Sequence, residues 1–514
     1  MPNNEHVALK SGLSVVTDVR RTVRAVLAAA LVVGSCSGQD TADRSTTITT
    51  TVETTTTTQV TTTSLPETRP AGSTQVGTST TAPVPEDAIQ LGNRHPTSHV
   101  GIRPSTVLPI DDRLGVGLYP AYPDLPAFDY LLAEFVASGV HRIDVSYADI
   151  EYPIDWSYSE TDIDPEFDRF ITNLNDQGIA VDYMLHFWDK AGHAAGEELT
   201  TPRFRTEDQI QDFLDYISFI VERYRGRIQY YTIWSEPDAC GDGGVKCIEP
   251  DDYLALAERV IPVIREIDPQ AKVALAPVVL FHARDYMASL VASDVISMFD
   301  VIQWHGVYNV TVGDTAIGRY YEEYPSIIAD IRETAAANGF EGEYWCTEIT
   351  YCEIRNSGCP HSDPPLSDRQ VATYYGRSIV SHLGMNIGTS YKTYRDTTSP
   401  VTFAVFGRLH TLLAGTTPTS LDVEIDTEAT DIATAAFSTS SDEMLALWID
   451  HAPSDDDSRT EASLTFAGMA GKTATGIDVI SGVQQQLNTT DHGPDLIVSD
   501  LLITDAPVIV RLAG

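Results

Sequence analysis

Basic side chains are scarce in this chain of 514 residues. Lysine and arginine together number 33, against 73 aspartates and glutamates, which gives a formal net charge of -40. A surface this acidic repels nucleic-acid phosphates and anionic lipid headgroups alike. We therefore expect no nucleic-acid partner and no electrostatic attachment to a membrane. The chain is too long for one ordinary domain and long enough for a barrel with a smaller module.

Long apolar runs are also scarce. The run Ala25 to Val33 is too short to span a bilayer as a stable helix. It follows the basic residues Arg20, Arg21 and Arg24 and leads into Cys36. Residues 1–36 thus resemble a bacterial lipoprotein signal, in which Cys36 is lipidated and becomes the N-terminus. An ordinary secretory signal, a start codon placed too early and twin-arginine export remain alternatives.

Residues 37–90 are rich in threonine and contain few apolar side chains. Such a segment cannot bury enough surface to offset chain entropy, so we expect a disordered linker. It would hold a folded part away from the membrane; a degradable or glycosylated stalk is the alternative. The protein is then either a cell-surface lipoprotein or secreted, attached to a membrane only through its N-terminal lipid. We expect a monomer.

Cysteine is rare, with six in the chain. Cys240 and Cys247 flank one loop, Cys352 and Cys359 flank another, and both pairs have the same spacing. Because loop cysteines of exported proteins are usually oxidised, we expect two disulfides. Cys346 is then left as a packed thiol within a strand. A zinc site of Cys346, Cys352 and Cys359 is the alternative, but its ligand spacing is poor.

Strand-like and helix-like segments alternate between residues 112 and 413. The predicted strands cover residues 114–119, 141–147, 179–187, 230–234, 272–280, 301–305, 343–348 and 387–394. The predicted helices cover residues 125–138, 164–178, 206–224, 252–267, 325–338, 367–383 and 402–413. This order predicts an α/β fold, a (β/α)8 TIM barrel formed by residues 91–415.

The texture changes after residue 416. Short strand-like runs cover residues 421–425, 432–438, 444–450, 462–466, 473–480 and 508–512, with Gly, Asp and Ser between them. Residues 416–514 are therefore predicted to form an all-β sandwich packed against the barrel.

Two glutamates follow strand-like runs. Residues 230 to 234 are aromatic or β-branched, and Pro237, which has no N–H to donate, ends the strand directly after Glu236. Glu348 has a similar place near the end of a later strand. Catalytic groups of parallel barrels collect at this end of the strands. Glycoside hydrolysis needs two such carboxyl groups, one to protonate the leaving oxygen and one to attack or stabilise the anomeric carbon.

The motifs around both glutamates resemble a known family. Ile233-Trp-Ser-Glu236-Pro-Asp resembles the Trp-Asn-Glu-Pro motif of clan A glycoside hydrolases, and Trp345-Cys-Thr-Glu348 resembles their seventh-strand Thr-Glu segment. The segment around Arg142 is similar to the second strand of families 39 and 5. The resemblance implies a retaining glycosidase that cleaves O-glycosidic, mainly β-, linkages of oligo- or polysaccharides. It implies Glu236 as acid/base, Glu348 as nucleophile, and no metal or organic cofactor.

The same resemblance suggests substrate-binding residues. His305 and Tyr308 are similar to a sixth-strand His and Tyr near the nucleophile, and His186 lies where it could meet a sugar hydroxyl. Ser235 stands in place of the family's asparagine. Arg142 could support Glu348 from below. Tyr391, or else Tyr394, would replace the missing eighth-strand tryptophan as the floor of the glycone site.

Two departures from the family pattern, Ser235 and the missing tryptophan, keep other functions open. A non-catalytic carbohydrate-binding surface lipoprotein on a degenerate barrel is the main alternative. A surface scaffold whose β-module binds a protein partner is a second. The presence of both glutamates favours the enzyme.

Overall fold

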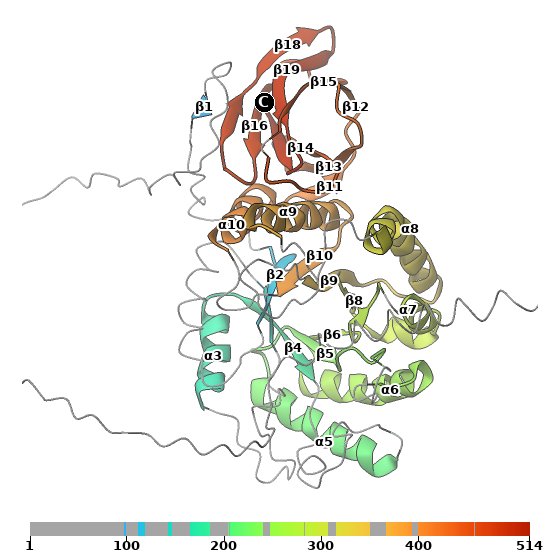
Figure 1. The fold of residues 1–514 in the computed structure, drawn as a ribbon. Helices are drawn as coiled ribbons and strands as arrows, with labels where there is room; N and C mark the ends of the chain where they lie inside the picture. The colour runs from blue at the N-terminus through green and yellow to red at the C-terminus, as the bar shows by residue number, and fades with distance from the viewer. Residues whose placement is uncertain are drawn as a thin grey trace, which may run out of the picture.

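A computed structural model gives the fold (Figure 1). It describes Thr97–Ser98 and residues 111–118, 142–145, 165–185, 204, 206–239, 247–281, 283–306, 315–349, 366–392, 399–456 and 458–514. The predicted signal, the predicted linker and the predicted helix at 125–138 lie outside these residues. In the part of the chain described, no helix is both long and apolar enough to cross a membrane.

Eight parallel strands form a closed ring, because each one pairs with two neighbours. The ring runs β2 (Leu114–Leu118), β3 (Arg142–Val145), β4 (Ala180–Leu185), β5 (Tyr230–Ile233), β6 (Lys272–Ala274), β8 (Val301–His305), β9 (Glu343–Ile349) and β10 (Gly388–Lys392). The predicted TIM-like barrel is therefore confirmed.

One predicted strand and one predicted helix differ from the structure. The strand expected over residues 272–280 is divided into β6 and β7 (Val278–Val279), with Pro277 between them. Proline has no N–H for a ladder, so pairing stops there. The helix expected to begin at Pro325 is α8 (Thr315–Ala337), which starts earlier and carries Pro325 inside. Treating that proline as a helix start was wrong.

The remaining helices cover the barrel. Thr206 caps α5 through a capping box with Gln209, and Pro250 occupies the first turn of α6. These elements are α3 (Pro165–Asp176), α5 (Glu207–Tyr224), α6 (Pro250–Ile267), α7 (Arg284–Val291), the 3-10 helix η1 (Asp294–Met298), α9 (Asp368–Gly384) and α10 (Pro400–Leu413).

A buried arginine fills the lower half of the barrel interior. The side chain of Arg142 is fully buried, and its guanidinium lies between two aromatic rings, 4.1 Å from Tyr230 and 3.5 Å from Trp345. It donates to Asp182 at 2.6 Å and to Asp144 at 3.1 Å. Burying a cation is expensive unless carboxylates and hydrogen bonds compensate it, and here both are present.

A polar layer lies directly above this arginine. Gln303 Nε2 donates to the Thr232 hydroxyl at 2.6 Å, and that hydroxyl donates to Asp182 at 2.7 Å. Burial, together with the charge of Asp144, raises the pKa of Asp182 to about 6, although Arg142 opposes the shift. The network links β3, β4, β5 and β8 across the interior.

Two antiparallel sheets form the predicted sandwich. Their strands follow the barrel in sequence, except β1, which precedes it and lies within the range 91–415 predicted for the barrel. The seven-stranded sheet has the order β1-β17-β16-β20-β14-β13-β11, and the four-stranded sheet has the order β12-β15-β19-β18. Their strands are β1 (Thr97–Ser98), β11 (Thr417–Thr419), β12 (Val423–Thr427), β13 (Ile432–Ser438), β14 (Asp442–Ile449), β15 (Thr460–Phe466), β16 (Thr473–Asp478), β17 (Gln484–Gln486), β18 (Asn488–His492), β19 (Asp495–Ile503) and β20 (Val508–Ala513).

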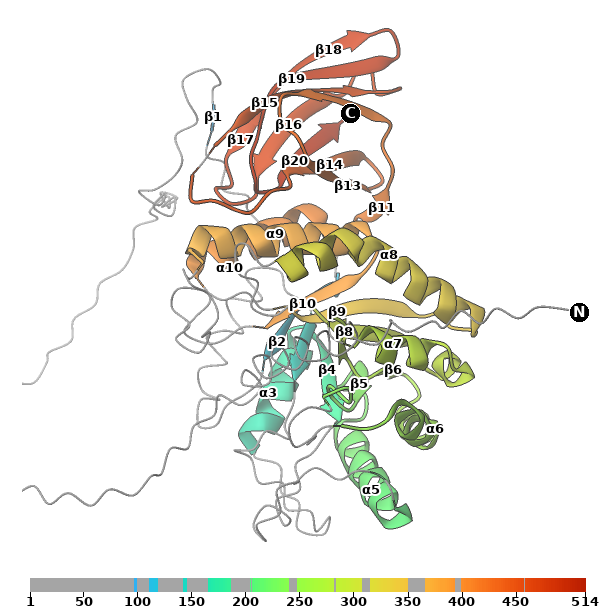
Figure 2. The ribbon, with the colours of Figure 1, turned by 45° about the vertical axis from the view of Figure 1, so that its right-hand side comes forward.

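The seven-stranded sheet is buried on both faces. Leu445 and Leu447 of β14 point into the sandwich core, whereas Ala446 and Trp448 belong to the same core cluster as the barrel. Successive side chains of a strand point to opposite faces, so one strand serves both cores. Figures 1 and 2 show α9 and α10 lying between the barrel strands and this sheet.

Arginines of α9 strengthen this contact. Arg377 donates to the backbone carbonyls of Asp505, Ile449 and His451 at 2.6, 3.0 and 2.8 Å, and Arg369 pairs with the Asp505 carboxylate at 2.6 Å. That pairing helps to lower the pKa of Asp505 against the opposing effect of burial.

The Arg142 network yields a stability prediction. Arg142→Met leaves Asp144 and Asp182 buried without their cation, so we expect the free energy of unfolding to fall by about 3–5 kcal/mol. Urea unfolding of the full chain at pH 7 measures it. Arg265→Met removes a largely exposed pairing with Asp300, and it should change stability by less than about 1 kcal/mol. Equal effects of the two substitutions would contradict the larger contribution to stability that we assign to the buried network.

Candidate active site

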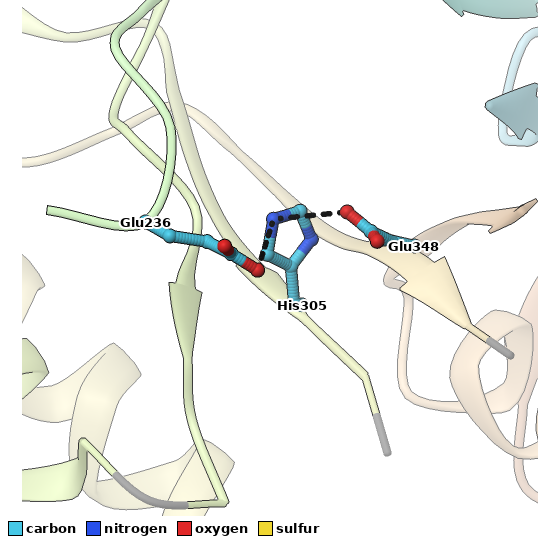
Figure 3. Close-up of side chains that lie close together, drawn as sticks. All are labelled: Glu236, His305 and Glu348. Atoms are coloured by element: carbon cyan, nitrogen blue, oxygen red, sulfur yellow. Dashed lines mark ion pairs between the residues drawn. The ribbon is translucent and has the colours of Figure 1, made fainter. Parts of the chain in front are cut away.

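Three side chains meet at the carboxyl end of the barrel strands (Figure 3). Glu236 follows β5, His305 ends β8 and Glu348 lies near the end of β9. The Nε2 atom of His305 is 3.3 Å from a carboxylate oxygen of Glu348 and 3.7 Å from one of Glu236. One oxygen of each glutamate and a ring nitrogen of the histidine all lie within 4.8 Å of one another. The sequence predicted all three as site residues.

Unusual backbone angles aim Glu236 into the barrel mouth. Alternation along β5 would turn Trp234 inward, because Thr232 faces the interior network. Trp234 has φ +72 instead, and its ring packs against Phe204 and Phe213 beside α5. Glu236 has φ +46, and its N–H donates to the carbonyl of Pro277 at 3.0 Å. L-residues adopt such angles at a cost, so the surrounding structure holds this turn under strain.

A β-bulge does the same for Glu348. On β9, Trp345 faces Arg142 in the interior and Cys346 is buried on the side of Trp304 and Tyr324, so regular alternation would also turn Glu348 away from the interior. The register between β9 and β10 shifts at this point, and Glu348 has φ +53. A bulge re-aims the following side chain. The extra residue therefore brings Glu348 to the mouth of the barrel.

His305 joins the two carboxyl groups. Its side chain is 1% exposed, against 20% for Glu236 and 9% for Glu348. The other ring nitrogen, Nδ1, is 3.4 Å from the hydroxyl of Thr347, the residue before Glu348. Gly306 follows, and a Cβ there would lie 2.7 Å from Ile349, so only glycine allows this approach of β8 to β9.

Asp238 is a fourth ionisable group that the sequence analysis missed. Burial and the nearby charge of Glu236 raise the pKa of Asp238 to about 6, while His305 partly opposes this. Its position in the printed motif, two residues after Glu236, was the available signal.

Two carboxylates and one imidazole are also side chains that commonly bind metal ions. Among the described residues, Glu236, His305 and Glu348 are the ones whose His and carboxylate atoms are close enough to share a cation. With its proton on Nε2, an imidazole at these distances donates toward both carboxylates. The three side chains can therefore serve acid–base chemistry without an ion. A cavity of about 460 Å³ lies elsewhere, at the opposite end of the barrel beside Glu343 and Trp345.

The structure corrects two of the predicted substrate-binding residues. Arg142 is fully buried below the mouth and contacts Asp144 and Asp182, so it acts in the barrel core rather than under Glu348. Tyr391 is 2% exposed and stacks on Phe406 of α10 at 3.5 Å between ring centroids. It points toward the helices because Ser390 takes the inward position on β10. Tyr391 therefore does not form a glycone floor.

The other predicted residues have varied outcomes. Ser235 is buried beside Glu236, which agrees with a place at the site but does not test substrate contact. His186 and Tyr308 lie outside the described residues, as do Tyr394, Cys36, Cys240, Cys352 and Cys359. The two predicted disulfides, including the one assigned to Cys247, therefore stay predictions. Cys346 is a buried free thiol, as expected.

A buried hydrogen-bonded chain supports the site from behind. Trp304, the residue before His305, donates from Nε1 to the Tyr324 hydroxyl at 2.9 Å. That hydroxyl lies 2.8 Å from His382 Nε2, and His382 Nδ1 lies 2.7 Å from the Ser378 carbonyl. Nδ1 therefore carries the proton and Nε2 accepts from tyrosine. Burial lowers the pKa of His382 to about 4.

Comparisons with known proteins agree with this fold. No family model matches the sequence, and no curated protein matches it. A solved family 39 glycoside hydrolase from the gut symbiont Bacteroides cellulosilyticus WH2 is similar at a TM-score of 0.54 and 15% identity, over 79% of this chain and 81% of that one. A GH30 endoxylanase from Clostridium papyrosolvens C71 has a TM-score of 0.52 and 12% identity, over 79% and 98% of the chains.

A third similar structure is a glucosidase from Croceicoccus marinus, with a TM-score of 0.52 and 13% identity over 79% and 97% of the two chains. The chain therefore has the fold of clan A glycoside hydrolases, which the motifs around Glu236 and Glu348 predicted.

The neutral state of His382 predicts a pH dependence. Its folded pKa of about 4 lies below the ordinary value of 6.5, so the unfolded chain takes up a proton first as pH falls. The contribution of neutral His382 to the free energy of unfolding is complete above pH 6.5. It falls by about 3 kcal/mol as the pH drops to 4. Urea unfolding between pH 7 and 4 should therefore show a smaller loss in His382→Gln than in the parent. Equal losses would contradict this role of His382.

The positive φ of Glu236 predicts that the site lowers stability. Asparagine adopts the left-handed region more readily than glutamine. The free energy of unfolding of Glu236→Asn should therefore be about 1 kcal/mol higher than that of Glu236→Gln. Both substitutions remove the charge, which leaves backbone strain as the main difference. Thermal and urea unfolding at one pH compare them. A glutamine variant as stable as the asparagine variant would mean that the turn stores no strain.

Proposed function

We propose that this protein is a retaining glycosidase that hydrolyses O-glycosidic bonds of oligo- or polysaccharides, chiefly β-linked. The observation that carries the proposal is the facing pair of carboxyl groups at the carboxyl end of a TIM-like barrel, with oxygens within 4.8 Å of each other. The fold supports it, since the similar structures include glycoside hydrolases of families 39 and 30.

The separation of the carboxyl groups supports retention of configuration. Retaining enzymes place them about 5–5.5 Å apart, whereas inverting enzymes leave about 6.5–9.5 Å for a water molecule. One oxygen of Glu236 and one of Glu348 lie within 4.8 Å of each other, which fits the shorter separation. A double displacement through a covalent glycosyl-enzyme therefore fits this site.

Burial and contacts support the assignment of roles. Glu348 is the less exposed glutamate and contacts His305, whose N–H would stabilise its carboxylate for attack. Glu236 is more open to solvent, as a group that exchanges protons with water must be. A negatively charged Glu348 nearby favours the protonated form of Glu236, which then protonates the leaving oxygen. After the sugar is attached, Glu236 takes a proton from the attacking water.

The setting of the enzyme is part of the same proposal. Lipidation of Cys36 would tether the barrel to a cell surface through the threonine-rich linker. Disulfides Cys240–Cys247 and Cys352–Cys359 would stiffen the loops after the two glutamates. We propose a carbohydrate as its binding partner and a monomeric state.

The leaving group separates the two roles. A panel of aryl β-glycosides is hydrolysed by the parent, Glu236→Ala and Glu348→Ala. Glu236→Ala should lose about 10²–10⁴-fold on poor leaving groups and much less on dinitrophenyl glycosides, which need no acid. Glu348→Ala should lose at least about 10³-fold on both kinds. Azide should restore Glu348→Ala and give a glycosyl azide of inverted anomeric configuration.

Glu343→Ala is the matched control, because Glu343 begins the strand that carries Glu348 and lies at its opposite end. It should stay within about threefold of the parent. A chelator should leave the parent's rate unchanged; a loss reversed by added metal would overturn the acid–base assignment. A parent that binds glycans and hydrolyses none would identify a carbohydrate-binding protein on a degenerate barrel instead.

A further inference from the structure

Asp238 and Glu236 belong to the same tight turn after β5. The Ala239 N–H donates to the Glu236 carbonyl at 3.1 Å, which closes the turn, and the Ile248 N–H donates to the Pro237 carbonyl at 3.0 Å. Together with the bond from the Glu236 N–H to Pro277, these contacts fix the turn at the mouth of the barrel. The two carboxyl groups are therefore held on one short rigid segment.

The carboxyl group of Asp238 is tied to a neighbouring strand end. Both of its oxygens face the Val279 N–H, at 3.3 and 3.4 Å. Val279 ends β7 and is paired in register with His305 on β8. Asp238 thus spans from the end of β5 to the strand beside His305.

The charges around Asp238 are of mixed sign. Burial raises the pKa of Asp238, the charge of Glu236 adds to this effect, and His305 opposes it. Burial raises the pKa of the Tyr286 phenol, and the charge of Asp238 adds to this effect. The Tyr286 hydroxyl donates to the Ile248 carbonyl at 2.7 Å. Coulomb repulsion is mutual, so whatever Glu236 does to the ionisation of Asp238, Asp238 does to Glu236.

We propose that Asp238 is a positioning residue for Glu236: its carboxyl group anchors the turn on Val279, and its negative charge holds the proton on Glu236. Glu236 then faces two acidic neighbours, Glu348 and Asp238, whose negative charges disfavour a further charge on it. The catalytic part of this inference rests on the proposed glycosidase function. The electrostatic part does not.

Titration of the carboxyl carbons tests the charge directly. The full chain is labelled at glutamate Cδ, and the Glu236 signal is assigned by its loss in Glu236→Gln. Asp238→Asn removes the charge but keeps an oxygen that accepts from Val279. The midpoint of Glu236 should fall by about 0.5–1 pH unit, a three- to tenfold loss of proton affinity. Glu266→Gln, which removes one charge from the exposed face of α6, should leave that midpoint unchanged.

The reciprocal measurement needs no change at Asp238. With aspartate Cγ labelled, the Asp238 midpoint should fall in Glu236→Gln, because the charge of Glu236 raises the pKa of Asp238. Midpoints that stay fixed in both directions would overturn the proposal. Asp238→Ala removes anchor and charge together and should lower kcat further than Asp238→Asn does.

Turnover separates this inference from the function on which it rests. The alkaline limb of kcat/KM should move to lower pH in Asp238→Asn together with the Glu236 midpoint. If the midpoint moves and the limb does not, the charge coupling stands and Glu236 is not the catalytic acid. If neither moves in a protein that hydrolyses glycosides, Asp238 has no such role.

Discussion

The rest of the barrel depends on the enclosed guanidinium of Arg142. It lies between the rings of Tyr230 and Trp345, which belong to β5 and β9. These two strands carry Glu236 and Glu348 at their other ends. Because a flat cation stacked between two rings leaves little freedom of spacing, it sets how far apart these strands stand. The distance between the two glutamates is thus fixed from inside the barrel, several residues below the site.

Regular strands would not deliver both glutamates to the same place. Alternation sends every second side chain outward, so it would turn Glu348 of β9 away from the mouth, and on β5 the outward ring of Trp234 interrupts the alternation before Glu236. Left-handed backbone angles at Trp234, Glu236 and Glu348, together with a bulge in β9, bring both carboxyl groups to the mouth. Such irregularity persists only where the neighbouring structure over-determines it. Here the bond from Glu236 to Pro277 and the buried Trp304–Tyr324–His382 chain provide that support.

The sequence predicted elements with a strong local pattern and missed what depends on three-dimensional context. The barrel and the pair Glu236 and Glu348 were predictable, because strand periodicity and two motifs pointed to them. Strand β19 was missed, although it is buried, because Ser499 and Asp500 interrupt its apolar run. The direction of the Tyr391 side chain depends on which residues of β10 face the barrel interior. No local signal in the sequence indicated this.

Arg142 and Asp238 show the same limit for charged groups. A buried arginine reads in sequence like any polar residue, and only the packed barrel shows which carboxylates and rings surround it. Asp238 stood in the printed motif, but its importance comes from Val279, which is 41 positions away in the chain. Residues that meet across a barrel cannot be paired from one sequence.

The double-sided burial of the seven-stranded sheet has a consequence for the history of the chain. A sugar-binding module attached by a flexible linker can be gained, lost or moved between enzymes, because nothing in the catalytic unit leans on it. Here Trp448 is packed into the barrel's own core and Arg377 ends on carbonyls of the sandwich. Without the sandwich, α9 would expose an apolar wall and leave buried donors unmet. The two modules therefore share one core, and exchange of either module alone would leave that core incomplete.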